Sequence, residues 1–158
     1  KVHGLTRVAI VDFDVHHGNG TEECFSNDMQ VLMVSTFQHP FYPYSGTEQP
    51  APNMVNIPLP SGTGGDEFCQ VVTDLWLPRL REFKPEMIFI SAGFDAHYED
   101  DLGGLKFLEK DFAWVTEQIK QIADETAQGR IVSILEGGYV LSALARSVSA
   151  HIKVLASI

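Results

Sequence analysis

Two aspartates and a histidine recur at every second position in the stretch Asp12-Phe13-Asp14-Val15-His16, and a second histidine and two glycines follow. Because successive side chains of a strand point to opposite faces, these three share one side if the preceding strand continues through them. Burying two carboxylates and an imidazole without partners costs several kcal/mol, so the cluster requires a cation or a large hydrogen-bond network. Our first hypothesis is therefore a metal site.

Two other interpretations fit the same residues. Aspartates are common turn and helix-cap residues at a protein surface. An Asp-x-Asp pair after an apolar strand is also typical of phosphotransferases in which the first aspartate attacks phosphorus. His16 fits that class less well, because Thr or Val usually occupies the fifth position of its signature.

Composition disfavours several classes of protein. With 158 residues, 44% hydrophobic and 20% charged, the chain resembles one globular domain or part of one. A net charge of −10 without a cluster of Lys or Arg disfavours direct binding of DNA or RNA. Since the sequence contains no apolar run of membrane-spanning length and no signal-peptide pattern, we expect a cytoplasmic protein. Cys24 and Cys69, which are far apart, are expected to be reduced and partly buried.

Apolar runs alternate with helical patterns along the chain. We expect strands at 7–11, 31–37, 55–60, 87–95 and 131–136, a short helix capped by Thr21, and helices at 66–83, 109–128 and 141–156. This alternation predicts an α/β fold with a mainly parallel sheet covered on both faces. Ligands bind such sheets beyond the carboxyl ends of the strands, where the 12–16 cluster, Asp95 and the Gly137-Gly138-Tyr139 turn all lie.

With these motifs, the chain resembles the histone deacetylase superfamily, in its class II and bacterial branches, within the arginase–deacetylase fold. The matching residues are 12–21, Ser91-Ala92-Gly93-Phe94-Asp95-Ala96, Leu102-Gly103-Gly104 and Leu135-Glu136-Gly137-Gly138-Tyr139. The resemblance spans nearly the whole chain. It implies a three-layer αβα domain with a mainly parallel sheet, of which residues 1–158 form the C-terminal part.

The resemblance also implies a catalytic Zn²⁺ bound by Asp14, His16 and Asp95, with Fe²⁺ or Mn²⁺ as other metals that suit these ligands. Three protein ligands leave a coordination position open, as a hydrolytic site requires. Tyr139 matches the family's tyrosine, whose hydroxyl stabilises an oxyanion. Asp12 matches the aspartate that orients a catalytic histidine.

Further sites follow from the same resemblance. A structural K⁺ would be bound by Asp12, Ser35 and the backbone carbonyls of Asp14, His16 and Thr36. A second monovalent cation would be bound by carbonyls near Phe25, Asp28 and Val31. Substrate would contact four residues that match the acyl-lysine tunnel and the glycine turn of the family: Tyr42, Leu102, Gly137 and Gly138. His17 is expected to be a structural histidine.

One catalytic group of the family lies outside this sequence. Its general base is one of two adjacent histidines upstream of the opening strand, and this chain opens on Lys1 rather than Met, close to that strand. His16-His17 is not that pair, because His16 is assigned to the metal. We therefore expect the N-terminal half of the domain to be missing, and the fragment alone to be inactive.

The resemblance thus implies a zinc-dependent amide hydrolase that removes acetyl or other acyl groups from lysine side chains or polyamine-like amines. Its partners would be an acylated lysine peptide or an acylated amine, without direct contact to nucleic acid or membrane. Two alternatives remain: a non-catalytic module of the same fold that binds partners or regulates them, and a binuclear manganese ureohydrolase. The last would require additional Asp and His ligands at the same strand ends.

Overall fold

A parallel five-stranded sheet forms the centre of the fold, with the strand order β3-β2-β1-β4-β5. The computed structural model describes residues 2–158, so the expected boundary at Lys1 lies outside the described residues. The strands are β1 (Val8–Asp12), β2 (Val31–Gln38), β3 (Met54–Leu59), β4 (Met87–Ala92) and β5 (Ile131–Leu135). The helices are α1 (Asn19–Phe25), α2 (Gly65–Val71), η1 (Val72–Trp76), α3 (Leu77–Phe83), α4 (Glu109–Thr126) and α5 (Leu141–Ala156). The predicted α/β fold with a parallel sheet is confirmed.

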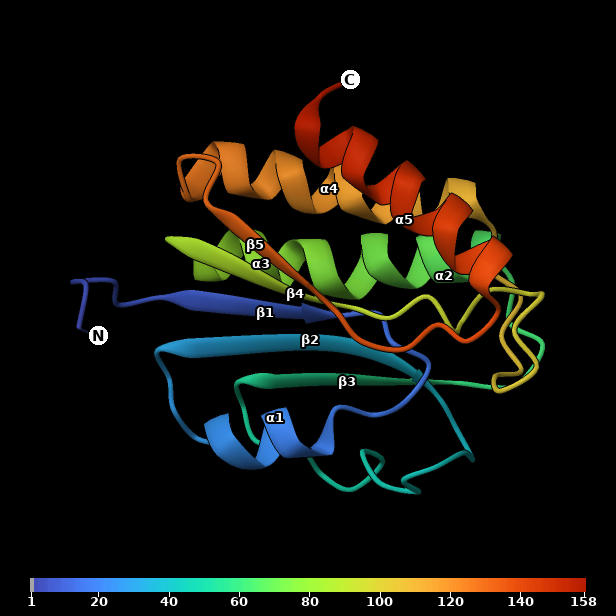
Figure 1. Ribbon diagram of the computed structural model, residues 1–158. Coiled ribbons are helices and arrows are strands. Elements are labelled where there is room, and N and C mark those ends of the chain that lie inside the picture. The colour runs from blue at the N-terminus through green and yellow to red at the C-terminus, as the bar shows by residue number, and fades with distance from the viewer. Residues whose placement is uncertain (1) are drawn as a thin grey trace.

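Helices lie on both faces of the sheet in unequal number. Figure 1 shows α2, α3, α4 and α5 on one face, and α1 on the other face, near β2 and β3. The alternation of strand side chains explains the two apolar clusters: Ala9 and Val11 pack in the large core, whereas Ile10 belongs to the small one. The large core is filled by aromatic and branched side chains that include Phe13, Trp76, Leu80, Ile90, Phe112 and Ile119.

The sheet face opposite α4 is uncovered by the described residues along β4 and β5. Within β5, Val132, Ile134 and Leu135 are exposed, and an apolar groove lined in part by Ile10, Phe89 and Ile134 runs along this face. Within the described residues, helices thus cover both faces of the sheet at β2 and β3, but only the face of α4 and α5 at β4 and β5.

The helix predicted at 66–83 is interrupted rather than continuous. The π-helical segment η1 separates α2 from α3 and ends directly before Leu77 and Pro78. Proline lacks an N–H, and its ring clashes with the carbonyl four residues earlier in an α-helix. A π-helical turn before Pro78 relieves that clash while the chain keeps its direction. The expected cap is also wrong, since α1 begins at Asn19 with Gly18 at its cap position rather than Thr21.

The order of the strands determines where a ligand would bind. From β1 the chain proceeds to β2 and β3 on one side, and then returns to β4 on the other side of β1. In open parallel sheets, ligands bind outside the carboxyl ends of the strands at such a reversal. The fold therefore predicts a ligand site among the residues that follow β1 and β4.

Candidate metal centre

Turns, rather than a continued strand, position the polar residues after β1. The strand ends at Asp12, so the condition under which Asp12, Asp14 and His16 would alternate along one strand is not met. Instead, the Asp14 N–H donates to Asp12 Oδ1 at 3.0 Å, and the His16 N–H donates to Asp14 Oδ1 at 2.8 Å. Short polar side chains form such turns readily. They bring Asp14 and His16 to the reversal between β1 and β4.

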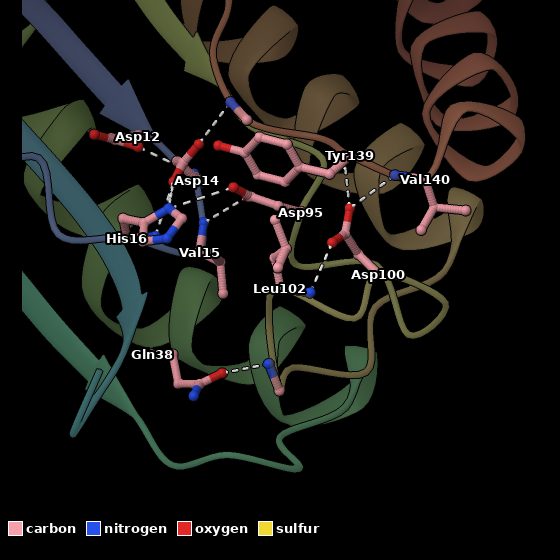
Figure 2. Close-up of polar contacts among 12 residues, drawn as sticks. Asp12, Asp14, Val15, His16, Gln38, Asp95, Asp100, Leu102, Tyr139 and Val140 are labelled. Carbon is pink, nitrogen blue, oxygen red and sulfur yellow. Dashed lines mark hydrogen bonds and ion pairs between the residues drawn. The ribbon is translucent and has the colours of Figure 1, made fainter. Parts of the chain in front are cut away.

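The structure brings together the three side chains that the sequence analysis assigned to a metal. One ligand atom each from Asp14, His16 and Asp95 lies within 4.8 Å of the other two. His16 Nδ1 lies 2.8 Å from Asp14 Oδ1 and 3.3 Å from Asp95 Oδ2 (Figure 2). A divalent ion with bonds of about 2.0–2.2 Å to each ligand requires donor atoms at about this mutual spacing. Across residues 2–158 this is the single group of its kind, so a second metal set, as in a binuclear ureohydrolase, is absent from the described chain.

Burial shifts the pKa values of the ionisable groups in this cluster. Asp95 is fully buried, and desolvation raises its pKa above the ordinary value. Asp12 is buried beside the cluster, where desolvation raises its pKa well above the usual range. Hydrogen bonds to Asp14 and Asp95 raise the pKa of His16 to about 10. The imidazolium proton thus supplies the positive charge that the carboxylates require, and a divalent cation would have to displace it.

Backbone N–H groups hold each carboxylate by the oxygen that faces away from the histidine. The Val15 N–H donates to Asp95 Oδ1 at 3.0 Å, and the Gly137 N–H donates to Asp14 Oδ2 at 2.9 Å. Asp95 Oδ2 is buried, accepts from no backbone N–H among the described residues and faces His16 Nδ1 at 3.3 Å. Since a buried carboxylate oxygen needs a positive partner, this atom fits a metal ligand once a cation takes the place of the imidazolium proton. The donor set of one imidazole and two carboxylates suits Zn²⁺, Fe²⁺ or Mn²⁺.

The glycine turn after β5 approaches the cluster so closely that side chains are excluded. A Cβ at Gly137 would overlap the carboxylate of Asp95, and a Cβ at Gly93 would overlap Asp14. Gly138 has a φ of 142°, which L side chains rarely adopt. Gly137 lets the backbone before Tyr139 pass over the two carboxylates, and Gly93 lets the chain that follows β4 pass beside Asp14.

Tyr139 belongs to the same pocket as Asp14 and His16. Its ring lies over Asp95 and extends toward Asp14 in Figure 2, and 54% of the residue is exposed. Partial burial, together with the carboxylates of Asp95 and Asp14, raises the pKa of Tyr139. The hydroxyl therefore keeps its proton at neutral pH and can donate it in a hydrogen bond.

Asp100, to which the sequence analysis assigned no role, holds the backbone at Tyr139 in place. This buried carboxylate accepts hydrogen bonds from the Tyr139 N–H at 2.7 Å and the Val140 N–H at 3.3 Å through one oxygen. Its other oxygen accepts from the Leu102 N–H at 3.0 Å (Figure 2). One side chain thus joins the loop that carries Leu102 to the turn that carries Tyr139. The sequence holds no signal for the contacts with Tyr139 and Val140, because these residues lie about forty positions from Asp100 in the sequence.

The expected tunnel residues lie at the rim of the centre. Tyr42 is 67% exposed and meets the His16 ring edge-on, with centroids 6.1 Å apart, and Leu102 is also exposed. Phe41, which was not assigned, stacks on His16 with centroids 5.3 Å apart. Gln38 Oε1 accepts from the Gly104 N–H at 2.6 Å and so fixes the end of the Leu102 loop to β2.

The first expected K⁺ site has features that fit a cation. Asp12 and Ser35 are paired in register on neighbouring strands, and both are buried. Ser35 Oγ has no hydrogen-bond partner within residues 2–158. The carbonyls of Asp14, His16 and Thr36 remain predicted ligands of this ion.

The second expected site and the second histidine have other partners. The carbonyls of Phe25, Asp28 and Val31 do converge, but on the side-chain amide of Asn53. His17 is buried between Glu22 and Ser45, with which its ring nitrogens pair at 2.6 and 2.8 Å. This is the geometry of a structural histidine. Cys24 is exposed, so the expectation of partial burial holds only for Cys69.

A parallel α/β sheet with two aspartates and a histidine at its reversal point defines a candidate metalloprotein of the open-sheet class. In a comparison with models of protein families, residues 1–155 match the histone deacetylase domain. The chain therefore belongs to the histone deacetylase family, and the resemblance in the sequence is confirmed.

Curated relatives and solved structures agree with this assignment. The chain is 42% identical to type-2 histone deacetylase 2 of Dictyostelium discoideum, covering 96% of the chain and 10% of that protein. It is 37% identical to a histone deacetylase-like amidohydrolase of Pseudomonas aeruginosa, covering 87% and 38% respectively. The crystal structure of the HDA15 HD domain superposes with a TM-score of 0.92 at 34% identity, covering 99% of the chain and 46% of that structure. The chain thus spans less than half the length of each of these relatives.

Proposed function

We propose that the complete protein is a metal-dependent amide hydrolase that removes acetyl or other acyl groups from lysine side chains or polyamine-like amines. The observation that carries the proposal is the group of two buried aspartates, Asp14 and Asp95, and the half-buried His16 beside the Tyr139 ring. The names of the relatives, histone deacetylases and a deacetylase-like amidohydrolase, support the reaction class. Zinc is the proposed metal, with Fe²⁺ or Mn²⁺ as alternatives that the same donors would hold.

Each residue of the centre has a separate part in this proposal. Asp14, His16 and Asp95 would hold the ion, which when bound polarises the amide carbonyl and lowers the pKa of a water molecule. Val15 and Gly137 fix the two carboxylates through their N–H groups, so that the donor atoms are in position before the ion binds. Tyr139 donates its hydroxyl hydrogen to the carbonyl oxygen of the substrate as negative charge develops there.

Proton transfer to the leaving amine requires a further group. Among the described residues, His16 is assigned to the ion, and His17 is paired with Glu22 and Ser45. We propose that a tandem histidine in the N-terminal half of the domain supplies this group, and that the present chain alone is inactive. Asp12, buried and bonded to the Asp14 N–H, would support it and take part in the K⁺ site.

The proposed substrates are acylated lysine peptides or acylated amines, which enter past Tyr42 and Leu102. In the part of the chain that the structure describes, the helices are too short or too polar to cross a bilayer. We propose that the protein requires neither a membrane nor nucleic acid for its activity, and a cytoplasmic location remains a prediction.

The test uses the complete natural protein, stripped of metal with a chelator and reloaded with Zn²⁺, Fe²⁺ or Mn²⁺. Acetate release from an acetyl-lysine peptide and from an acetylated polyamine is measured before and after reloading. We expect no release from the stripped protein and recovery with at least one metal. A protein that binds metal stoichiometrically but hydrolyses neither amide would instead support the non-catalytic alternative.

A further inference from the structure

Three backbone carbonyls of the turn between α1 and β2 point at one side-chain nitrogen. Asn53 Nδ2 lies 2.9 Å from the carbonyl oxygen of Phe25, 3.1 Å from that of Asp28 and 2.9 Å from that of Val31. Asn53 is 3% exposed and directly precedes β3. A residue on the approach to the edge strand thus closes the turn that leads into β2.

The orientation of this amide is determined by its other end. Asn53 Oδ1 accepts a hydrogen bond from the Asn27 N–H at 3.0 Å, which places the oxygen away from the three carbonyls and the nitrogen among them. The backbone carbonyl of Asn53 also accepts from the Met33 N–H at 3.0 Å, so the residue is fixed to β2 by its main chain. Reversing the amide would set an oxygen against three oxygens and leave the Asn27 N–H unpaired.

The three carbonyls outnumber the two hydrogens that the Asn53 amide nitrogen can donate. An amide nitrogen carries two hydrogens, and here it has three acceptors, so at least one hydrogen is shared. Convergent backbone carbonyls are a common way to replace the hydration shell of a monovalent cation. The same three carbonyls are the ones for which the family resemblance implies a second monovalent cation.

We propose that the Asn53 amide stands in for that cation, so that the turn between α1 and β2 is held together by the protein itself and needs no ion. The chain would then use monovalent cations only where Asp12 and Ser35 lie. That site differs in kind, because Ser35 Oγ lacks a hydrogen-bond partner in the described chain, whereas every atom of the Asn53 amide is engaged.

The presence of the Asn53 amide in place of a cation has a consequence for the metal centre. Helix α1 begins two residues after His17 and carries Glu22, which pairs with the His17 ring beside His16. Holding the end of α1 by a covalently attached amide keeps this support in place at any ionic composition. A cation in the same place would make the support depend on the salt concentration.

The decisive experiment is anomalous diffraction from crystals of the complete protein grown with Tl⁺ in place of K⁺. We expect wild-type crystals to show no Tl⁺ peak among the carbonyls of Phe25, Asp28 and Val31. In the Asn53→Ala variant, which removes the amide and leaves the carbonyls, we expect a peak at that point. A peak there in the wild type would overturn the proposal, and so would its absence in a folded Asn53→Ala protein.

A solution measurement covers the case in which the variant fails to crystallise. Thermal midpoints are compared in KCl and in choline chloride at equal ionic strength. We expect K⁺ to raise the midpoint of Asn53→Ala by several degrees more than that of the wild type. Asn19→Ala, which removes an exposed amide from the start of the same helix, should respond to K⁺ as the wild type does. An equal response of Asn53→Ala and wild type would contradict the proposal.

Discussion

Two carboxylates that follow the same strand, β4, are both buried but are satisfied in opposite ways. Asp95 has one oxygen on a backbone N–H, whereas the other accepts from no backbone N–H in the described chain and lies 3.3 Å from His16 Nδ1. Asp100 has both oxygens engaged by backbone N–H groups of Leu102, Tyr139 and Val140. Burial alone therefore does not mark a reactive carboxylate. The oxygen that faces only an imidazole in the described chain indicates a place for an ion, whereas the carboxylate held at both oxygens by backbone N–H groups indicates a structural anchor.

The largest effect should come from neutralising Asp95. In the complete protein we expect Asp95→Asn to lose more than about 100-fold in affinity for the divalent metal, because a charged ligand is replaced by a neutral amide. Amide hydrolysis should fall to background. Metal content after dialysis, measured by mass spectrometry, checks this, and Asp100→Asn should keep its metal. Full metal occupancy in Asp95→Asn would show that Asp95, like Asp100, is not needed for metal binding.

Removal of the Tyr139 hydroxyl should have the next largest effect. We expect Tyr139→Phe to lower kcat by about 10²–10³-fold, the usual effect of removing one oxyanion donor, while the metal content stays unchanged. Tyr98 is a matched control, since it is exposed to a similar degree, 50% against 54%. Tyr98→Phe should retain its kcat. Equal kcat values for both variants would remove Tyr139 from the reaction.

Asp100→Asn should act through Tyr139 and not through the metal. An amide in place of the carboxylate sets N–H groups against the N–H donors of the turn, which should cost about 1–3 kcal/mol of stability. Because the tyrosine is then less well positioned, kcat should fall about tenfold with little change in KM. Asp101→Asn, at the exposed neighbour, is the control.

A double variant separates positioning by Asp100 from general damage. In the Tyr139→Phe background, Asp100→Asn should lower kcat no further, because the group that it positions is already gone. An undiminished tenfold loss in that background would show that Asp100 acts by another route.

The smallest effect concerns His151, a buried group that is satisfied by hydroxyls. Thr116 Oγ1 lies 2.6 Å from one ring nitrogen and Ser133 Oγ 2.8 Å from the other, and burial lowers the pKa of His151 from 6.5 to about 4. The unfolded chain therefore binds a proton more readily than the folded one between these values, and the free energy of unfolding falls as pH drops from 6.5 to 4.

The matched variant for this prediction is His151→Gln, which cannot titrate. We expect its thermal midpoint to decline less than that of the wild type over this pH range, with the pH dependence above pH 7 unchanged. Parallel pH profiles would show that His151 does not contribute to acid sensitivity.

The sequence was sufficient for the parallel sheet and for the grouping of the three candidate metal ligands. Most strands are mainly apolar runs, and parallel strands bring their carboxyl ends to one edge, so the 12–16 cluster and Asp95 could be placed together from the order of the residues. The family resemblance supplied the choice of Asp14, His16 and Asp95 and their roles. The helix from 109 and the helix from 141 were also predicted with bounds close to those observed.

What could not be predicted depends on contacts between distant segments. The anchors made by Asp100 and Asn53 use backbone groups, which any residue provides, so side-chain patterns do not reveal them. The exposure of β5 depends on which face of the sheet α4 and α5 cover, and the apolar content of these segments does not indicate that face. A helix through Pro78 was predicted, but the sequence pattern did not indicate the π-helical turn that precedes this proline.

The central place of β1 has a consequence for the order of folding. This strand pairs with β2 soon after it in the chain, but its other neighbour, β4, must first be brought back past two strands and the helices between them. Pairings between residues so distant in sequence form slowly. Asp14 and His16 are therefore in place early and Asp95 arrives late, so if the proposed site binds a metal, uptake of that metal by a refolding chain should report the docking of β4.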